Sequence, residues 1–353
     1  MASVVVVGAV VAMWLLAGEA RGQAQLQVGF YAHSCPQAEV IVRDEVGRAV
    51  SANPGFAAGL LRLHFHDCFV KGCDASVLLD STANSTAEKD APPNKSLRGF
   101  EVIDAAKQRL EAACAGTVSC ADILAFAARD SVVLAGGGPW RPGRAEGRQR
   151  LGGVRRAGQP ASPTANVAHL HGGLRQECRL SQEDMVTLSG TTSHHPAHAN
   201  PLLTAHSPAH TVRFYFYSGA HTIGLTHCSS FSARLHGYNA TTGTGQDPAM
   251  DGAKAAELAR QCPPGSPDAV PMDGGSPDAF DTGYFRALLA NHGVLASDQT
   301  LTSDNATAAL VAQNAGNVYL FVTRFGDAMV RMGGIRALTG GDGQIRANCR
   351  VVN

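Results

Sequence analysis

Arg62 and His66 form the residue pair in this sequence that is best suited to acid–base chemistry. They lie four residues apart in the segment Leu60-Leu-Arg-Leu-His-Phe-His-Asp-Cys-Phe-Val70, so on a helix they would share one face. An imidazole can carry a proton at neutral pH, and a fixed guanidinium can stabilise developing negative charge. The spacing alone is equally typical of a surface helix, so the residues that follow carry the argument.

Oxygen-bearing groups cluster directly after this pair. The cluster holds Asp67, Asp74 and Ser76, together with the backbone carbonyls of Val70 and Gly72. Hard cations such as calcium bind about six to eight oxygens of this kind. The spacing and the missing terminal Glu exclude an EF-hand loop. The sequence therefore predicts a different kind of calcium loop here.

A second oxygen cluster lies in the segment Asp273-Gly-Gly-Ser-Pro-Asp-Ala-Phe-Asp281. Asp273, Ser276, the carbonyl of Ala279 and Asp281 could close around another cation. Asp-Gly-Gly and Ser-Pro are also ordinary turn sequences, so a polar turn without an ion is the alternative.

His221 stands between small residues in Ser218-Gly-Ala-His-Thr-Ile-Gly224. Small neighbours would let a flat cofactor approach the imidazole, although a buried core histidine would fit the same pattern. Asp298 is a candidate partner for the far ring nitrogen, because a carboxylate there makes a histidine a more basic ligand.

Helical patterns must position these groups. Apolar residues recur at spacings of three and four over 103–113, 284–289 and 321–332. Ser119 with Asp122 and Ser181 with Asp184 have the spacing of helix-capping pairs. Strand patterns are weak, and the run from Ser76 is too short to decide. The chain is therefore expected to be mostly α-helical.

Composition excludes several classes of protein. The 353 residues carry 29 basic and 29 acidic side chains, and 44% are hydrophobic. A disordered chain needs low hydrophobicity and high net charge, and a nucleic-acid-binding protein usually has a basic excess. Residues 1–24 form an apolar run followed by small residues, which predicts a secretory signal peptide cleaved near Ala24. An uncleaved membrane anchor is the alternative, and no later apolar run is long enough to span a membrane.

Nine cysteines fit an oxidising compartment, where eight could form four disulfides and one would be left over. None forms a CxxC pair, which argues against a zinc ribbon or a thioredoxin-like site. Sequons at Asn84, Asn239 and Asn305 predict surface glycosylation, and Asn94 begins a fourth match.

Two stretches interrupt the helical order. Residues 141–159 are rich in Arg, which suits either a polyanion site or a solvated loop, and the lack of aromatic residues favours the loop. Residues 191–219 hold five histidines among Pro, Ala, Ser and Thr. This second stretch could bind metal, but without periodicity it is better interpreted as an unstructured loop.

Taken together, the motifs resemble those of the plant secretory (class III) haem peroxidases. The resemblance covers about residues 25–353, which would form one domain after the signal peptide, except for the two irregular stretches. The matching motifs are Arg62-Leu-His-Phe-His-Asp-Cys68, Gly72-Cys-Asp-Ala-Ser76, Glu88-Lys-Asp90, Val118-Ser-Cys-Ala-Asp122, Gly219-Ala-His-Thr-Ile-Gly224, Phe280-Asp281, Ser297-Asp-Gln299 and Gly343-Gln-Ile-Arg-Ala-Asn-Cys349.

The resemblance implies an all-α fold of two lobes with haem b between them. His221 would be the axial ligand of the haem iron, with Asp298 behind it and Phe65 also on the cofactor. His66 would be the distal base, Arg62 would stabilise the charge on the departing oxygen, and Asn94 would hydrogen-bond His66. A glycan on Asn94 would disable that role, so its sequon is expected to be unused.

The resemblance also implies two calcium ions and four disulfides. The distal ion would be bound by Asp67, Val70, Gly72, Asp74 and Ser76, with Glu88 nearby. The proximal ion would be bound by Thr222, Asp273, Ser276, Ala279 and Asp281. The implied disulfides are Cys35–Cys114, Cys68–Cys73, Cys120–Cys349 and Cys228–Cys262, which leaves Cys178 as the odd cysteine.

The implied activity is reduction of hydrogen peroxide with one-electron oxidation of small phenolic donors. The protein would be a secreted monomer in the cell wall, apoplast or vacuole, with no nucleic-acid or membrane partner. A zinc hydrolase using His64, His66 and the His-rich stretch is a third hypothesis, which the absence of an HExxH motif disfavours.

The sequence departs from the family pattern in two places. The donor-contacting proline of the family corresponds to Pro160, out of register by one residue. The family runs Leu-Ser-Gly-Ala-His-Thr without interruption, whereas here residues 191–219 separate Leu188-Ser-Gly190 from Ala220-His-Thr222. The segment is interpreted as an insertion, such as retained intron sequence. The alternative function is therefore a catalytically impaired, haem-poor secreted glycoprotein of the same fold.

Overall fold

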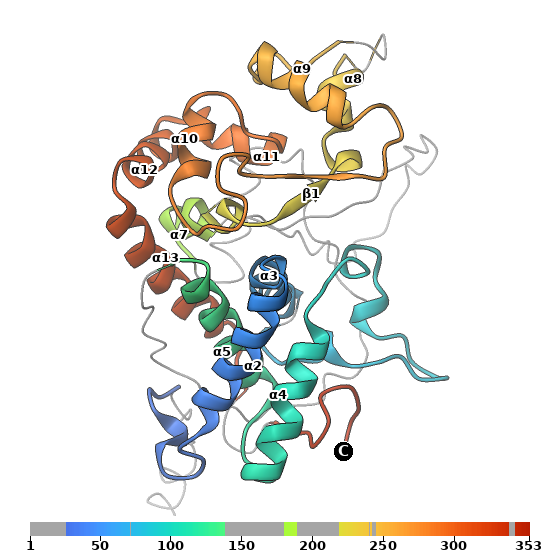
Figure 1. Ribbon diagram of the computed structural model, residues 1–353, viewed down its shortest axis with the longest axis vertical. Coiled ribbons are helices and arrows are strands. Elements are labelled where there is room, and N and C mark those ends of the chain that lie inside the picture. Colours follow the sequence, from blue (N-terminus) through green and yellow to red (C-terminus); the bar gives the residue numbers. More distant parts are fainter. Residues whose placement is uncertain are drawn as a thin grey trace, which may run out of the picture.

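Figure 1 shows the computed structural model of the chain, which describes residues 26–70, 72–137, 180–188, 219–239, 241, 245–338 and 343–353. Its α-helices are α2 (Ala38–Ala52), α3 (Gly55–Val70), α4 (Phe100–Ala113), α5 (Cys120–Leu134), α7 (Gln182–Leu188), α8 (Ser232–His236), α9 (Gly252–Gln261), α10 (Gly283–Leu289), α11 (Ala296–Gln299), α12 (Asn305–Gly316) and α13 (Val318–Gly333). Strands β1 (Leu225–His227) and β2 (Ala269–Pro271) form one antiparallel pair. The predicted all-α class is confirmed.

Helix α3 is the central element of the fold, and it is buried on two faces. Leu60 and Leu63 pack into one hydrophobic core with residues of α2, α4 and α5. Leu61 and Phe65 pack into a second core with residues of α7, α10, α12 and α13. A helix that is apolar all round belongs in the interior, which explains why α3 can carry functional side chains inside the molecule.

A third, smaller core lies beside β1 and β2 and includes Phe231, Leu258 and Val270. It is built by α8, α9 and the strand pair, and the Cys228–Cys262 disulfide lies within it. In Figure 1 this unit lies at the end of the molecule opposite α2 and α4. The sequence patterns did not predict the strand pair, and the run from Ser76 is a 3-10 turn, Ser76–Leu78.

Both predicted capping pairs are present. The hydroxyl of Ser119 accepts a hydrogen bond from the backbone N–H of Asp122 at 3.0 Å, and α5 begins there. The hydroxyl of Ser181 accepts from the N–H of Asp184 at 3.1 Å, and the Asp184 carboxylate accepts the N–H of Ser181 at 2.9 Å. These caps satisfy N–H groups that a helix start leaves without partners.

Four disulfides link the described chain, and they are the four pairs that the resemblance implied. They join Cys35 to Cys114, Cys68 to Cys73, Cys120 to Cys349 and Cys228 to Cys262. Cys178 lies outside the described residues, as do the predicted signal peptide, the 141–159 stretch, Pro160 and residues 191–218. Among the described helices, none is long and apolar enough to cross a membrane.

Candidate active site

His66 lies inside the molecule on α3, held by a single amide. Its Nδ1 lies 2.7 Å from Oδ1 of Asn94, whose Nδ2 donates to the carbonyl of Glu88 at 2.8 Å. Because the amide nitrogen of Asn94 is already used as a donor, its oxygen faces His66 and the ring proton lies on Nδ1. The Nε2 atom is buried and has no hydrogen-bond partner among the described residues, so it is free to accept a proton.

The surroundings of His66 strongly favour its neutral form. Burial, and then the positive charge of Arg62, lower the pKa of His66 from 6.5 to about 3, although the hydrogen bond with Asn94 acts in the opposite direction. Removing a charged imidazole from water is costly, and a nearby cation adds repulsion. The ring is therefore a neutral proton acceptor throughout the physiological pH range.

Arg62 lies one helical turn before His66 and is fixed by a neighbouring loop. Its Nη1 donates to the carbonyl of Ser96 at 3.2 Å, and its Nη2 donates to the carbonyl of Pro93 and to the hydroxyl of Ser96. Burial, with a contribution from Arg98, lowers the pKa of Arg62 to about 10. The guanidinium is still charged at neutral pH, so a rigid cation stands beside a neutral base.

His221 lies in the 3-10 turn Gly219–Thr222 and is paired with a carboxylate from α11. Its Nδ1 lies 2.8 Å from Oδ2 of Asp298, and both side chains are almost fully buried. The Nε2 atom on the other side of the ring is buried and has no hydrogen-bond partner in the described part of the chain. A carboxylate on Nδ1 orients the ring and fixes the tautomer that leaves Nε2 as the ligand atom, as in histidines that bind metals.

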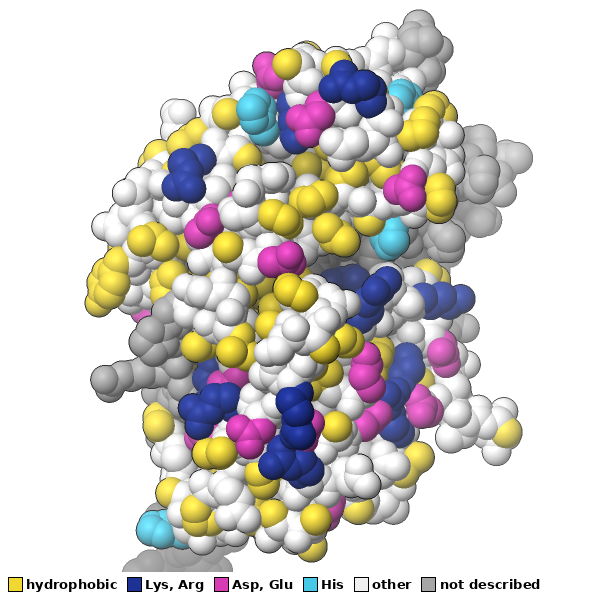
Figure 2. All heavy atoms as spheres, in the orientation of Figure 1, with side chains coloured by type: hydrophobic (Ala, Val, Ile, Leu, Met, Phe, Trp, Pro, Cys, Tyr) yellow, Lys and Arg dark blue, Asp and Glu magenta, His cyan; other side chains and the backbone are white. Residues whose placement is uncertain are grey.

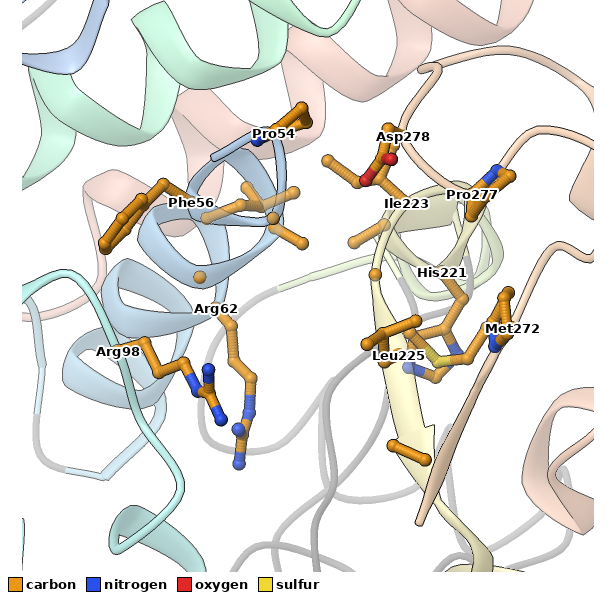
Figure 3. Close-up of a pocket in the computed structure, with 18 of the residues that line it drawn as sticks. Pro54, Phe56, Arg62, Arg98, His221, Ile223, Leu225, Met272, Pro277 and Asp278 are labelled. Carbon is orange, nitrogen blue, oxygen red and sulfur yellow. The ribbon is translucent and has the colours of Figure 1, made fainter. Parts of the chain in front are cut away.

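Arg62 and His221 line one cavity of about 460 Å³. Figure 3 shows Arg62 and Arg98 on the α3 side of this space, and His221, Leu225 and Met272 on the opposite side. The volume lies within the range of about 300–1,000 Å³ that is usual for cofactor sites. Residues that are far apart in the sequence therefore meet across a slot, as a cofactor between two lobes requires.

The lining includes residues that sequence reasoning missed. Ser96, Arg98 and His227 belong to the same cavity, and they provide hydroxyl, guanidinium and imidazole groups suited to carboxylates. Figure 2 shows Lys and Arg side chains gathered at mid-height, where the α3 half of the molecule meets the other half. No motif of the sequence singled these residues out, because they come from two segments that are far apart in the chain.

Phe65 is not among the residues that line this cavity. It is buried in the core, where its ring stacks on Phe69 with centroids 4.4 Å apart and lies edge-on to His66 at 5.9 Å. In this structure its contacts support α3 and the ring of His66.

The first oxygen cluster contains a buried carboxylate with an unused oxygen. Oδ2 of Asp67 accepts the N–H of Ala75 at 2.9 Å, whereas its Oδ1 has no partner within the described ranges. The hydroxyl of Ser76 donates to Glu88 at 3.0 Å. Burial and the nearby charges of Asp74 and Glu88 raise the pKa of Asp67 well above its usual range. A divalent cation at this place would relieve that repulsion, so the donor set fits calcium.

The second oxygen cluster also converges. The hydroxyl of Thr222 donates to the carbonyl of Asp281 at 2.8 Å, and the hydroxyl of Ser276 donates to Asp273 at 3.3 Å. A Cβ built on Gly283 would lie 2.3 Å from a carboxylate oxygen of Asp273 and 3.0 Å from one of Asp281. The two carboxylates therefore crowd over this glycine, where a cation would offset their charge.

The structure does not support the zinc hydrolase hypothesis. Ligand atoms of His64, Asp67 and Cys68 lie within 4.8 Å of one another, but the Cys68 sulfur is bonded to Cys73. Nδ1 of His64 lies 3.7 Å from that sulfur, whereas His66 is hydrogen-bonded to Asn94. Burial lowers the pKa of His64 to about 4, as expected for a neutral core histidine.

The chain matches the family model described as peroxidase over residues 42–317. It is 50% identical to Peroxidase 5 of Vitis vinifera over 337 residues, which cover 94% of this chain and 92% of the relative. It is 43% identical to Peroxidase 3 of Arabidopsis thaliana, with 94% and 93% covered, and 41% identical to Peroxidase 1 of Oryza sativa subsp. japonica, with 94% of each covered.

The chain therefore belongs to the peroxidase family, and the resemblance to the plant class III enzymes is confirmed. It is a haem peroxidase, with hydrogen peroxide and an electron donor as the substrates that the family implies. These similarities favour the peroxidase over the haem-poor alternative. One boundary is corrected: Gly219, placed in the irregular stretch by the sequence analysis, belongs to the turn that carries His221.

Proposed function

We propose that the protein is a secreted peroxidase that reduces hydrogen peroxide and oxidises small phenolic donors in one-electron steps. The observation that carries the proposal is a pair of buried imidazoles, His66 and His221, each held through Nδ1 and neither with an Nε2 partner among the described residues. His221 and Arg62, which lies one helical turn before His66, line the same cavity. The residues fit a haem, whose iron His221 would hold through its buried Nε2. When bound, haem supplies the redox chemistry, since it stores the oxidising equivalents of the peroxide and passes them on singly.

The distal residues would manage the proton and the charge of the peroxide. His66 Nε2 accepts the proton from one peroxide oxygen and returns it to the oxygen that departs. Arg62 stabilises the negative charge that develops on the departing oxygen. Asn94 holds the ring in the tautomer that leaves Nε2 as the acceptor. Arg98, Ser96 and His227 are suited to bind the carboxylates of the haem.

Two calcium ions would support the two lobes. The distal site would use Asp67, Val70, Gly72, Asp74 and Ser76, with Glu88 held against Ser76. The proximal site would use Thr222, Asp273, Ser276, Ala279 and Asp281. The distal site follows α3 directly and the proximal site includes the neighbour of His221, so each ion would stabilise the element that carries a functional histidine.

Export and a monomeric state complete the proposal. An oxidising compartment suits a chain with four disulfides. The apolar residues 1–24 suit a signal peptide, and the cell wall, apoplast or vacuole is the destination. The predicted donor contact, Pro160, lies outside the described residues and stays a prediction from the resemblance.

Titration of the refolded chain with haemin tests the proposal. We expect a shifted Soret band at one haemin per chain, and peroxide-dependent oxidation of a simple phenol such as guaiacol. His221→Ala should lose the shift, whereas His66→Leu should keep the haem and lose most of the peroxide reaction. A parent chain that leaves the haemin spectrum unchanged would restore the haem-poor alternative.

A further inference from the structure

Gly219 lies in unusually close contact with the last turn of α7. A Cβ built on Gly219 would lie 1.7 Å from the carbonyl oxygen of Thr187 and 2.7 Å from its carbonyl carbon. It would also lie 2.8 Å from the ring of Phe321. Two of these three atoms are backbone, so they cannot turn aside as a flexible side chain would. At this place any residue larger than glycine must displace the chain.

The surface that Gly219 touches is firmly anchored. Met185, Val186 and Leu188 of α7 are buried in the core. Two ion pairs join α7 to α13: Arg331 Nε donates to Asp184 at 2.9 Å, and Arg324 pairs with Glu183 at 2.5 Å. Phe321, the third neighbour of Gly219, also lies on α13 and is fully buried. An added side chain at position 219 would therefore move the turn rather than the helix.

We propose that Gly219 is a positioning residue for the haem ligand His221. Because it has no side chain, the turn Gly219–Thr222 can pack directly against the C-terminal end of α7. His221 follows two residues later, and its Nδ1 meets Asp298 only if the turn is seated. The inference rests on the proposed role of His221 as the iron ligand. The new element is that the contact between Gly219 and Thr187, rather than the covalent link between α7 and the turn, sets the position of His221.

The contact places the turn Gly219–Thr222 against α7, although residues 189–218 separate the two in the sequence. Ser-Gly occurs twice, as Ser189-Gly190 directly after α7 and as Ser218-Gly219 directly before Ala220-His221. The structure assigns the position against Thr187 to the second glycine, which is the copy that leads to the ligand.

Substitution of the two glycines tests this assignment in the full chain. In Gly219→Ala we expect haemin binding to weaken about tenfold or more, from overpacking against a fixed backbone. The iron–imidazole band in the resonance Raman spectrum of the ferrous protein should also shift or disappear. Gly190→Ala should match the parent, and so should Gly316→Ala, whose added Cβ would meet no atom within 4 Å. Parent-like behaviour of Gly219→Ala, or equal damage from Gly190→Ala, would overturn the proposal.

The same substitution in a His221→Gly variant distinguishes a positioning role from a general loss of structure. In His221→Gly the iron ligand is replaced by added imidazole, which is not tethered to the turn. Gly219→Ala should then have little effect on imidazole-supported haemin binding, and an equal loss in both backgrounds would refute a positioning role. If His221→Gly keeps its Raman band without imidazole, the proposed function fails at His221, which is a different result.

A deletion covers the case in which Gly219→Ala does not fold. Removal of residues 191–219 joins Gly190 to Ala220 and puts a glycine three residues after Thr187. This shortened chain should bind haemin as the parent does, and Gly190→Ala should become damaging in it. A shortened chain that folds by circular dichroism but does not bind haemin would contradict the proposal.

Discussion

Replacement of Asp298 gives the sharpest test of the proximal site. Its carboxylate lies 2.8 Å from Nδ1 of His221, and the side chains of both residues are at most 2% exposed. Asp298→Ala would leave a buried N–H without a partner, which costs about 1–3 kcal/mol. Loss of the group behind a metal-binding histidine typically weakens metal affinity about 10–100-fold, which corresponds to roughly 1.4–2.7 kcal/mol. The first cost falls on the stability of the fold and the second on haem affinity, so we expect haemin to dissociate about 10–100 times faster.

Transfer of haemin to excess apomyoglobin measures this rate. Ser297→Ala is the matched control, because Ser297 is the neighbour of Asp298 on α11 and its buried hydroxyl has no partner among the residues described. The control should change the rate less than twofold, since surplus buried hydroxyls contribute little. Asp298→Asn keeps an acceptor oxygen, so it should bind haemin better than Asp298→Ala while lowering the iron–imidazole frequency. A transfer rate for Asp298→Ala within twofold of the parent would refute the reasoning.

Four further predictions concern the distal side. The pKa of His66 is lowered to about 3, so the rate of the peroxide reaction, measured by stopped flow, should fall only as the pH drops toward 3. Arg62→Leu removes the second cause of that shift, so the acid limb should move to higher pH but stay below 6.5, because burial is the larger cause; a downward move would contradict this. Asp67→Ala should reduce the calcium content from two ions per chain to one in metal analysis. It should also reduce the drop in melting temperature that a calcium chelator causes. At a free calcium concentration of 100 times Kd, one site stabilises the fold by about 2.7 kcal/mol. Peptide mapping of protein from a secreting host should find no glycan at Asn94, because both polar atoms of its amide are already hydrogen-bonded inside the core; a glycan there in active enzyme would refute the role of this residue.

Local features were determined by the sequence itself. Arg62 and His66 share a face because the geometry of a helix places residues four apart on one side. Ser119 and Ser181 cap helices because a short hydroxyl side chain can reach an N–H three residues ahead. The oxygen clusters at 67–76 and 273–281 could be recognised because their members are near neighbours in the chain. The disulfide pairs followed only from the resemblance, since cysteine spacing does not fix connectivity.

The tertiary structure alone decided which distant groups meet. His221 contacts Asp298 of α11 although the two are 77 residues apart in the sequence, and Arg62 of α3 lines the same cavity as His221. Arg98 and His227 had no motif to mark them, and Gly219 is singled out only by its distance from Thr187. Such contacts depend on how buried faces pack, which no local spacing encodes. The sequence thus names the chemical groups, and packing sets the distances at which they act.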